Sequence, residues 1–360
     1  MIQKKIRVAV LGYGISARVF HLPFFTTTLT GQFELVAILQ RNGDDAKKAH
    51  PEIKIYRDLD SLLQNADIDL VVITTPNDTH FPFAQKALEA GKHVVLEKPF
   101  TNTSEEAAQL VNLTKTSGKI LSVYQNRRYV SDFRTIKDIL DKKLLGEVHE
   151  FEAHYDRYRM EARPNAWREA PLPGSGILYD IGAHIIDQAL YFFGMPSTIT
   201  ADIRLQRSHA RVDDYFVIWL NYSYTKVILH AGMLVREPGP RYMVQGTRGS
   251  FIKYGEDPQE QRLRKGELPL GDAWGRESEE TYGLLHTDIN NKIIREKYPS
   301  LPGSYADYYH DVYKSITSGA PVNVKPEHGY NVIRIIELAM QSHKEGKTIA
   351  CTGLIDVDYF

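Results

Sequence analysis

The stretch of sequence that decides the expected fold is residues 6–17, which read IRVAVLGYGISA. Residues 6–11 are apolar apart from Arg7, as in a strand that is buried on both faces of a sheet. They are followed by Gly12-Tyr13-Gly14-Ile15-Ser16-Ala17, a Gly-x-Gly-x-x-Ala pattern. Its glycines permit a tight turn and close approach of the backbone to a pyrophosphate, and the small Ala17 lets the next helix pack near the sheet. Backbone N–H groups at the start of that helix then hold phosphates, so the pattern predicts a dinucleotide-binding strand, loop and helix.

The same alternation of strand and helix continues over the first 125 residues. Val, Ile and Leu dominate the apolar runs, which show little polar alternation. Helical segments at 78–90 and 104–116 stop at Gly91 and Gly118, and a glycine just past the last turn is a common helix stop. This order predicts a doubly wound parallel sheet, and we assign residues 1–125 to a dinucleotide-binding Rossmann domain. The expected strands are residues 6–11, 33–39, 53–56, 70–74, 93–96 and 120–124.

From residue 126 onward strands follow one another without helices between most of them. This order is typical of an antiparallel or mixed sheet. We assign residues 126–360 to a second, α+β domain that binds substrate and mediates oligomerisation. Residues 255–302 are polar, rich in glycine and poorly periodic, so we expect a long loop or a partly helical excursion there. The expected strands are residues 150–158, 198–205, 215–222, 226–234, 242–246 and 250–253, with helices at 131–142, 177–193, 304–318 and 327–344.

The overall composition excludes several classes of protein. A chain of 360 residues exceeds what one hydrophobic core usually serves, so two domains are expected. Its 44 basic and 45 acidic residues leave a formal net charge of −1, which removes the global electrostatic reason to expect a nucleic acid or an anionic membrane as partner. The one cysteine, Cys351, cannot form an intramolecular disulfide or a multi-cysteine metal site. No apolar run approaches the ~20 residues that cross a bilayer, and the charged N-terminus does not resemble a signal peptide, so we expect a cytoplasmic protein.

The end of the second strand indicates which dinucleotide binds. An NAD site normally places Asp or Glu here to accept a hydrogen bond from the ribose 2′-OH, but this chain has Gln40 and Arg41. The planar donors of an arginine suit a 2′-phosphate, and its flat face suits adenine. NADP is therefore the predicted cofactor; NAD, with Arg41 as an ordinary solvated side chain, is the alternative.

Two other strand ends carry polar residues where ligands of open α/β sheets bind. The fourth strand is followed by Thr75-Pro76-Asn77 and the fifth by Glu97-Lys98-Pro99. A residue before proline is held in an extended conformation, so we expect Lys98 to point into the crevice. A solvated surface amine is the alternative, and the position beside the expected nicotinamide argues against it.

A helix of the second domain carries a candidate acid–base pair. Asp180 and His184 are four residues apart and share one face, with Asp187 one turn further along. Oxidation of a secondary alcohol requires a base for the hydroxyl proton, and histidine, with an unperturbed pKa of ~6.5, suits that role at neutral pH. A carboxylate one turn away orients the ring and stabilises its protonated form. A purely structural pair is the alternative. We expect no metal site, because zinc requires three or four ligands and no further cluster of His, Asp and Glu supplies them.

Three of these motifs together resemble the Gfo/Idh/MocA family of NAD(P)-dependent oxidoreductases, over nearly the whole chain. They are the glycine loop, the Glu97-Lys98-Pro99 triplet and the helix with Gly176, Asp180 and His184. Residues 155–158, 167–169, 174–188 and 241–260 further resemble the family's NADP-dependent scyllo-inositol dehydrogenase branch. The resemblance implies a Rossmann domain followed by an open, mostly antiparallel sheet, and proton transfer by Lys98 and His184 with Asp180 beside them. It also implies cofactor contacts from Gly12, Tyr13, Gly14, Ile15, Ser16, Ala17, Thr75, Pro76, Asn77, Glu97, Asn126 and Arg168. Arg41 and Lys98 are further predicted cofactor contacts because of their positions at the strand ends.

The resemblance further implies a polyol or sugar as substrate, with scyllo-inositol and its ketone as first candidates. Lys98, Asp180 and His184 would contact it, and Tyr155 and Trp167 would add flat faces and polar donors, with ordinary core packing as the alternative. An open sheet invites burial against a copy of itself, so a homodimer or homotetramer is expected. Two other functions stay open: a non-catalytic, NADP-binding sugar sensor, and a reductase of a non-sugar substrate.

Overall fold

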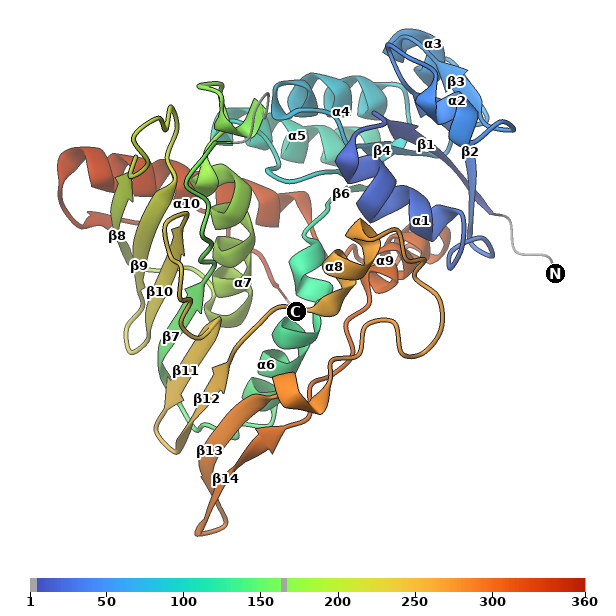
Figure 1. Ribbon diagram of the computed structural model, residues 1–360. Helices are drawn as coiled ribbons and strands as arrows, with labels where there is room; N and C mark the ends of the chain where they lie inside the picture. Colours follow the sequence, from blue (N-terminus) through green and yellow to red (C-terminus); the bar gives the residue numbers. More distant parts are fainter. Residues whose placement is uncertain (1–4, 163–166, 360) are drawn as a thin grey trace. The chain divides into compact units, whose positions relative to one another are not determined.

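The computed structural model describes residues 5–162 and 167–359, which form two compact units (Figure 1). Unit 1 contains the chain up to Asn126 together with Pro258–Trp274 and Ser304–Tyr330. Unit 2 contains Arg127–Asp257, Gly275–Gly303 and the chain from Asn331 onward. Two later segments of the chain therefore return to the unit that the N-terminal residues build.

Unit 1 is built on a six-stranded, wholly parallel sheet in the order β3-β2-β1-β4-β5-β6. The order reverses between β1 and β4, and ligands of such sheets bind at the carboxyl ends of the strands next to this switch point. The predicted doubly wound parallel sheet is confirmed. The strands are β1 (Ile6–Leu11), β2 (Phe33–Leu39), β3 (Lys54–Tyr56), β4 (Leu70–Ile73), β5 (His93–Leu96) and β6 (Leu121–Val123).

Unit 1 also contains helices, and two of them come from late in the chain: α8 (Pro258–Arg264) and α9 (Tyr305–Ser318). Tyr309 of α9 packs edge-on against Phe25 and Phe33, with ring centroids 4.6 and 5.9 Å away. The α5 helix begins after the N-cap Thr103, whose side chain accepts a hydrogen bond from Glu106 N, and it ends at Gly118 with φ at +62°. The helices of this unit are α1 (Leu22–Phe25), α2 (Asp45–Ala49), α3 (Leu59–Leu63), α4 (His80–Glu89), α5 (Ser104–Ser117), α8 (Pro258–Arg264) and α9 (Tyr305–Ser318).

Unit 2 is built on a nine-stranded sheet in the order β14-β13-β12-β11-β7-β10-β9-β8-β15. Its neighbours pair antiparallel except β7 and β10, which are parallel, so the expected open, mostly antiparallel sheet is confirmed. The strands are β7 (Val148–His154), β8 (Thr198–Arg204), β9 (Tyr215–Asn221), β10 (Lys226–Gly232), β11 (Tyr242–Gly246), β12 (Gly249–Lys253), β13 (Gly283–Ile289), β14 (Lys292–Tyr298) and β15 (Ile349–Ala350).

One face of this sheet carries the core of unit 2. Side chains of β9 alternate strictly between buried and half-buried, as in a strand with one covered face. Helix α7 (Ala183–Phe193) packs on the covered face, where the rings of Phe192 and Phe193 contact Phe151 of β7. The helices of unit 2 are α6 (Ser131–Asp141), α7 (Ala183–Phe193) and α10 (Pro326–Glu345), whose first residues, up to Tyr330, belong to unit 1.

The prediction of a long loop over residues 255–302 is wrong in its second half. After α8 the chain forms the hairpin β13–β14, closed by Asn290 and Asn291, whose φ angles are +54° and +61°. A two-residue hairpin turn of type I′ requires positive φ at both positions, and asparagine tolerates it. The Asn290-Asn291 pair was the one signal in the sequence for this turn. The second strand shows no apolar alternation, because β14 is exposed and highly charged and has no buried face.

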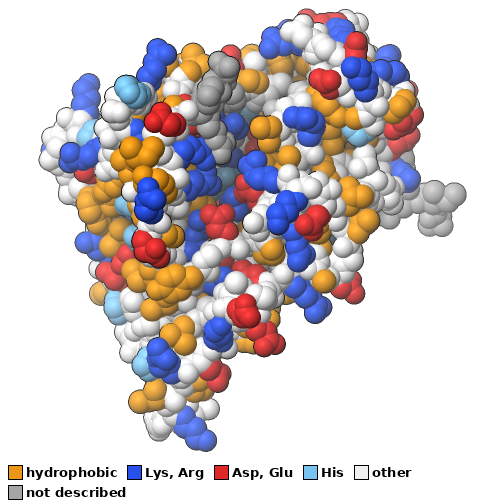
Figure 2. All heavy atoms as spheres, viewed as in Figure 1, with side chains coloured by type: hydrophobic (Ala, Val, Ile, Leu, Met, Phe, Trp, Pro, Cys, Tyr) orange, Lys and Arg blue, Asp and Glu red, His pale blue; other side chains and the backbone are white. Residues whose placement is uncertain are grey.

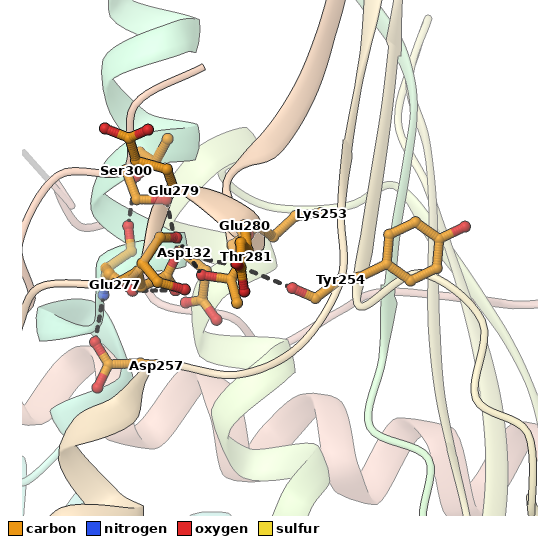
Figure 3. Close-up of polar contacts among 12 residues, drawn as sticks. Asp132, Lys253, Tyr254, Asp257, Glu277, Glu279, Glu280, Thr281 and Ser300 are labelled. Atoms are coloured by element: carbon orange, nitrogen blue, oxygen red, sulfur yellow. Dashed lines mark hydrogen bonds and ion pairs between the residues drawn. The ribbon is translucent and has the colours of Figure 1, made fainter. Parts of the chain in front are cut away.

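A buried lysine fixes the segment that leads into this hairpin (Figure 3). Lys253, at the end of β12, donates to the carbonyl oxygens of Tyr254 and Thr281, both at 2.8 Å, and pairs with Glu277 at 3.1 Å. Glu277 also accepts from Ser300 at 2.7 Å. The Lys253 and Glu277 side chains are 1% and 2% exposed, so the full set of partners is what makes burying both charges tolerable.

The surface drawn in Figure 2 shows acidic and basic side chains interspersed over both units. This distribution agrees with the nearly balanced count of 44 basic and 45 acidic residues. Among the helices of residues 5–162 and 167–359, none is both long and apolar enough to cross a membrane.

Candidate active site

The glycine loop of unit 1 lies where β1 ends, and its first glycine is required by space as well as by conformation. Gly12 has φ at +100°, and a Cβ there would lie 3.0 Å from Thr74 Oγ1 and 3.2 Å from Thr75 Cγ2. Ala17 is fully buried at the start of the π-helix Ala17–His21, while the Ile15 side chain is 57% exposed. The loop therefore has a tightly packed base and an open outer side, which fits a pyrophosphate approached by backbone N–H groups.

Glu97 joins this loop to the end of β5. Its Oε1 accepts hydrogen bonds from Ser16 Oγ and, at 3.0 Å, from His21 Nε2, while Oε2 accepts from Lys98 N at 3.1 Å. Burial alone would raise the pKa of Glu97, but the hydrogen bonds from His21 and Ser16 and the charge of Lys98 bring this pKa to about 2. The Glu97 carboxylate therefore stays ionised at neutral pH. The next peptide bond, Lys98–Pro99, is cis.

His21 is a residue of this site that the sequence did not predict. Its ring is fully buried and also lies 2.6 Å from Tyr309 Oη through Nδ1. Its partner Glu97 is 76 residues away in the chain, so no local spacing points to the pair. The only signal was a histidine four residues after the motif alanine.

His80 connects the two strand ends that carry the other predicted cofactor residues. Its Nδ1 lies 2.8 Å from the carbonyl oxygen of Pro99 and its Nε2 lies 3.0 Å from that of Thr75. The ring is 1% exposed. Thr75-Pro76-Asn77 and Glu97-Lys98-Pro99 are therefore held beside one another at the same edge of the sheet.

Arg41 stands on the exposed loop after β2. Its neighbour Gln40 is engaged structurally, because its Oε1 accepts from Ala46 N at 2.9 Å. Arg57 is also engaged, as it binds the Gln40 carbonyl oxygen at 2.9 Å and pairs with Asp44 at 2.5 Å. Arg41 makes no ion pair with any residue that the structure describes, so its guanidinium is accessible to an anionic ligand.

In unit 2 the predicted acid–base helix begins with one wide turn. Asp180 belongs to the π-helix Leu178–Gly182, and His184 lies in the first turn of α7, which continues it. Such π-turns occur frequently at functional sites. His184 is 6% exposed, and the Asp180 side chain is 30% exposed.

Asp213 holds the start of this helix in place. Its Oδ2 accepts from Leu178 N at 2.7 Å, and its carbonyl oxygen accepts from Ile177 N at 3.0 Å. A Cβ at Gly176, where φ is +93°, would collide with this carboxyl group. Burial raises the pKa of Asp213 to about 6 against the opposing effect of its backbone hydrogen bonds. The absence of a side chain at Gly176 therefore leaves the space in which the Asp213 carboxyl group caps the start of the helix.

A pocket opens beside Asp180 within unit 2. Arg168 Nε lies 3.5 Å from Asp180 Oδ1, so the arginine predicted as a cofactor contact pairs here with a predicted catalytic carboxylate. Arg207, which also lines the pocket, pairs with Asp214 at 2.8 Å and with Glu169 at 3.1 Å. The pocket is lined by Arg157, Arg159, Arg168, Glu169, Gly176, Ile177, Asp180, Arg207, Val212, Asp213, Asp214 and Met233.

Asp187, one turn beyond His184, forms a buried ion pair. Arg128 donates two hydrogen bonds to the Asp187 carboxylate, from Nε at 2.7 Å and from Nη2 at 2.6 Å, so the pair is bidentate. The side chains of Arg128 and Asp187 are 5% and 2% exposed. Burial raises the pKa of Asp187 although Arg128 acts in the opposite direction. This pair fixes α7, and with it His184, to Arg128 at the start of unit 2.

The remaining predicted residues are distributed as follows. Tyr155 is 1% exposed, and its ring is covered by the Arg241 guanidinium 2.9 Å from the ring centroid. Asn126 is 7% exposed in the 3₁₀ turn. Trp167 begins the 3₁₀ turn Trp167–Glu169, and its side chain lies outside the described part of the structure. Lys98 belongs to unit 1, whereas Asp180 and His184 belong to unit 2.

A glycine loop after the first strand of a parallel sheet, a lysine at a strand end, and a helix with Asp180 and His184 on an open sheet are together typical of a dinucleotide-dependent oxidoreductase. The chain belongs to the Gfo/Idh/MocA family: residues 6–125 match its NAD-binding Rossmann domain, and residues 137–351 match its C-terminal α/β domain. The family assignment made from the motifs is thereby confirmed, and a nicotinamide dinucleotide is the cofactor class.

Relatives match over almost the full chain. The scyllo-inositol 2-dehydrogenase (NADP⁺) IolW of Bacillus subtilis is 41% identical, with 96% of this chain and 95% of that protein covered. The uncharacterised oxidoreductase YdgJ of Escherichia coli is also 41% identical, with 96% and 98% covered. The solved structure of yvaA from Bacillus subtilis superimposes with a TM-score of 0.92 at 41% identity, covering 96% of this chain and 98% of that one.

Proposed function

We propose that this protein is an NADP-preferring dehydrogenase that interconverts a secondary alcohol of a polyol or sugar and the corresponding ketone, with scyllo-inositol as first candidate. The observation that carries the proposal is the strand end at Glu97-Lys98, where an ionised carboxylate fixes the lysine backbone beside the glycine loop. The similarity to an NADP-dependent inositol dehydrogenase supports the choice of substrate and cofactor.

The residues of this chain fit a nicotinamide dinucleotide. A Cβ would fill the cradle at Gly12, and Ile15 offers an exposed apolar side chain on the same loop. In the proposal the glycine loop and Thr75-Pro76-Asn77 hold the pyrophosphate, Arg41 binds the 2′-phosphate, and Asn126 and Arg168 add contacts. When bound, the nicotinamide supplies the hydride acceptor or donor.

The proton is handled by the protein's own side chains. His184 accepts the hydroxyl proton when the alcohol is oxidised and returns it when the ketone is reduced. Asp180 orients the imidazole and stabilises its protonated form, and Arg168 holds the Asp180 carboxylate from the pocket side. Lys98 contacts the reacting oxygen and lowers the energy of the charge that develops on it.

Cofactor absorbance at 340 nm tests the reaction directly. Purified protein is mixed with NADP⁺ or NAD⁺ and a panel of inositols, sugars and non-sugar alcohols, and with the reduced cofactors and the matching ketones. The expected result is turnover with a polyol or sugar. Tight NADP(H) binding without turnover on any member would support the sensor alternative, and turnover confined to non-sugar compounds would reject the substrate class.

Replacing Arg41 by alanine is expected to weaken NADP(H) binding roughly tenfold to a hundredfold, because a charge-assisted hydrogen bond contributes about 1.5–3 kcal/mol. NAD(H) lacks the 2′-phosphate, so its affinity should change little. Cofactor fluorescence titration measures both constants. Lys48→Ala, which removes another exposed cation from the neighbouring helix, is the control. Equal losses for the two cofactors would contradict the assignment.

We also expect the protein to assemble through unit 2. The sheet face turned away from α7 carries a row of half-buried apolar side chains on neighbouring strands: Val217, Trp219, Ile228, Met243 and Ile252. Burying such a row against its symmetric copy removes it from water. Light scattering after size exclusion should give at least twice the 41.1 kDa of one chain, and Trp219→Glu should reduce that mass. A monomer at micromolar concentration would refute the prediction.

A further inference from the structure

The same sheet face brings together two histidines and an aspartate that the reaction does not use. His154 ends β7, and His230 is its registered partner on the parallel neighbour β10. Asp156 follows His154 by two residues. The Asp156 carboxylate lies between the rings, with Oδ1 2.8 Å from His230 Nδ1 and Oδ2 3.7 Å from His154 Nδ1. One ligand atom from each of the three residues lies within 4.8 Å of the others.

The closest contact in this cluster joins Asp156 to His230. Asp156 Oδ1 and His230 Nδ1 are both shielded from solvent and lie 2.8 Å apart as an ion pair, and neither atom meets the angular criterion of a hydrogen bond within the described structure. The Asp156 side chain is 7% exposed. A shielded carboxylate oxygen without a partner costs free energy, so such an atom usually has a ligand, an ion or a water beside it. When the His230 ring carries its proton on Nε2, Nδ1 and the Asp156 oxygen are both electron-pair donors, and at this separation they are placed as ligands of a common cation.

The second ring nitrogen of His154 supports the same conclusion. Its Nε2 lies 2.9 Å from Glu152 Oε2 on the same face of β7. A histidine that ligates a metal through one nitrogen commonly donates the other N–H to a carboxylate, which fixes the tautomer and the orientation of the ring. In that tautomer the lone pair is on Nδ1, the nitrogen that faces Asp156.

We propose that His154, Asp156 and His230 form a binding site for a divalent transition-metal cation, with Zn²⁺ as the probe. Two imidazole nitrogens and one carboxylate oxygen suit Zn²⁺, and water completes its coordination. The ion would connect β7 and β10, the one parallel pair of the sheet, and so stabilise unit 2. The site is separate from Lys98, Asp180 and His184 and does not depend on the proposed reaction.

Metal content and stability test the site without reference to turnover. The full-length protein is treated with a chelator, incubated with ZnCl₂, desalted and analysed by mass spectrometry for zinc per chain; calorimetric titration gives the affinity. One Zn²⁺ per chain and a higher melting temperature are expected. Co²⁺ in place of Zn²⁺ should give visible absorption bands that report its nitrogen and oxygen ligands.

Variants assign the ion to these residues. Asp156→Asn, which preserves the shape of the side chain, and His230→Ala should each weaken Zn²⁺ binding at least about tenfold, since loss of a supporting residue alone typically costs 10–100-fold. Circular dichroism checks that each variant is folded. His286→Ala removes an exposed histidine from the same face of the sheet and should leave affinity unchanged. Absence of stoichiometric zinc in the wild-type protein, or full binding in the His154→Ala/His230→Ala double variant, would overturn the proposal.

Discussion

Alanine in place of His184 is expected to lower the turnover number by roughly 10²–10⁴-fold, the usual scale for loss of a general acid–base group. The imidazole is positioned at the junction of a π-turn and α7, where the Asp213 cap and the Arg128–Asp187 pair restrain the helix. Cofactor affinity should change little, because the glycine loop and Arg41 belong to unit 1. Steady-state kinetics gives the turnover number, and cofactor fluorescence gives the affinity.

Two further variants separate the roles within the proposed site. Asp180→Asn should reduce turnover less than His184→Ala if the carboxylate only orients the ring and stabilises its charge. Lys98→Ala should also reduce turnover and disturb substrate or cofactor placement. His209→Ala, an exposed histidine of unit 2, is the matched control and should behave as wild type. Near-normal turnover in folded His184→Ala would return the Asp180–His184 pair to a structural role.

Replacing Arg128 by methionine is expected to lower the free energy of unfolding by about 3–5 kcal/mol. The substitution leaves Asp187 buried without its partner, and an uncompensated buried charge has a cost of this order. The guanidinium also lies over the rings of Tyr191 and Tyr359, 5.1 and 5.4 Å from their centroids, so those contacts are lost as well. Urea denaturation followed by circular dichroism measures the change.

A double variant and a surface pair test the reason for this loss. Arg128→Met combined with Asp187→Leu should destabilise less than the sum of the single variants, because no unpaired charge remains. Lys137→Met breaks a pair with Asp141 whose side chains are 36% and 56% exposed, and should cost at most about 1 kcal/mol. Equal costs for Arg128→Met and Lys137→Met would show that burial of the pair does not matter.

The sequence by itself determined the class of fold and the motif residues. Buried parallel strands are continuous apolar runs, and the stop signals of the helices are local, so the six strands of unit 1 could be located within a residue or two. The glycine loop could also be predicted, because the positive φ of Gly12 and the burial of Ala17 depend on residues that are close together in the sequence. Helix 177–193 was predicted, but the π-turn at its start was not.

The partners of these residues were decided only by the tertiary structure. His21 meets Glu97 across 76 residues, Arg128 meets Asp187 across 59, and His230 reaches Asp156 through the pairing of β7 with β10. Local periodicity predicts which face of a helix or strand a side chain occupies. The residue that it contacts on that face depends on strand order and register. The same limit applies to Tyr155: the sequence proposes its ring as a substrate contact, and only the structure shows that the Arg241 guanidinium lies over that ring. The local sequence therefore determines which residue types lie on which face of a helix or strand. The pairing of distant segments determines which buried charges have a partner of opposite charge and which polar side chains lie together.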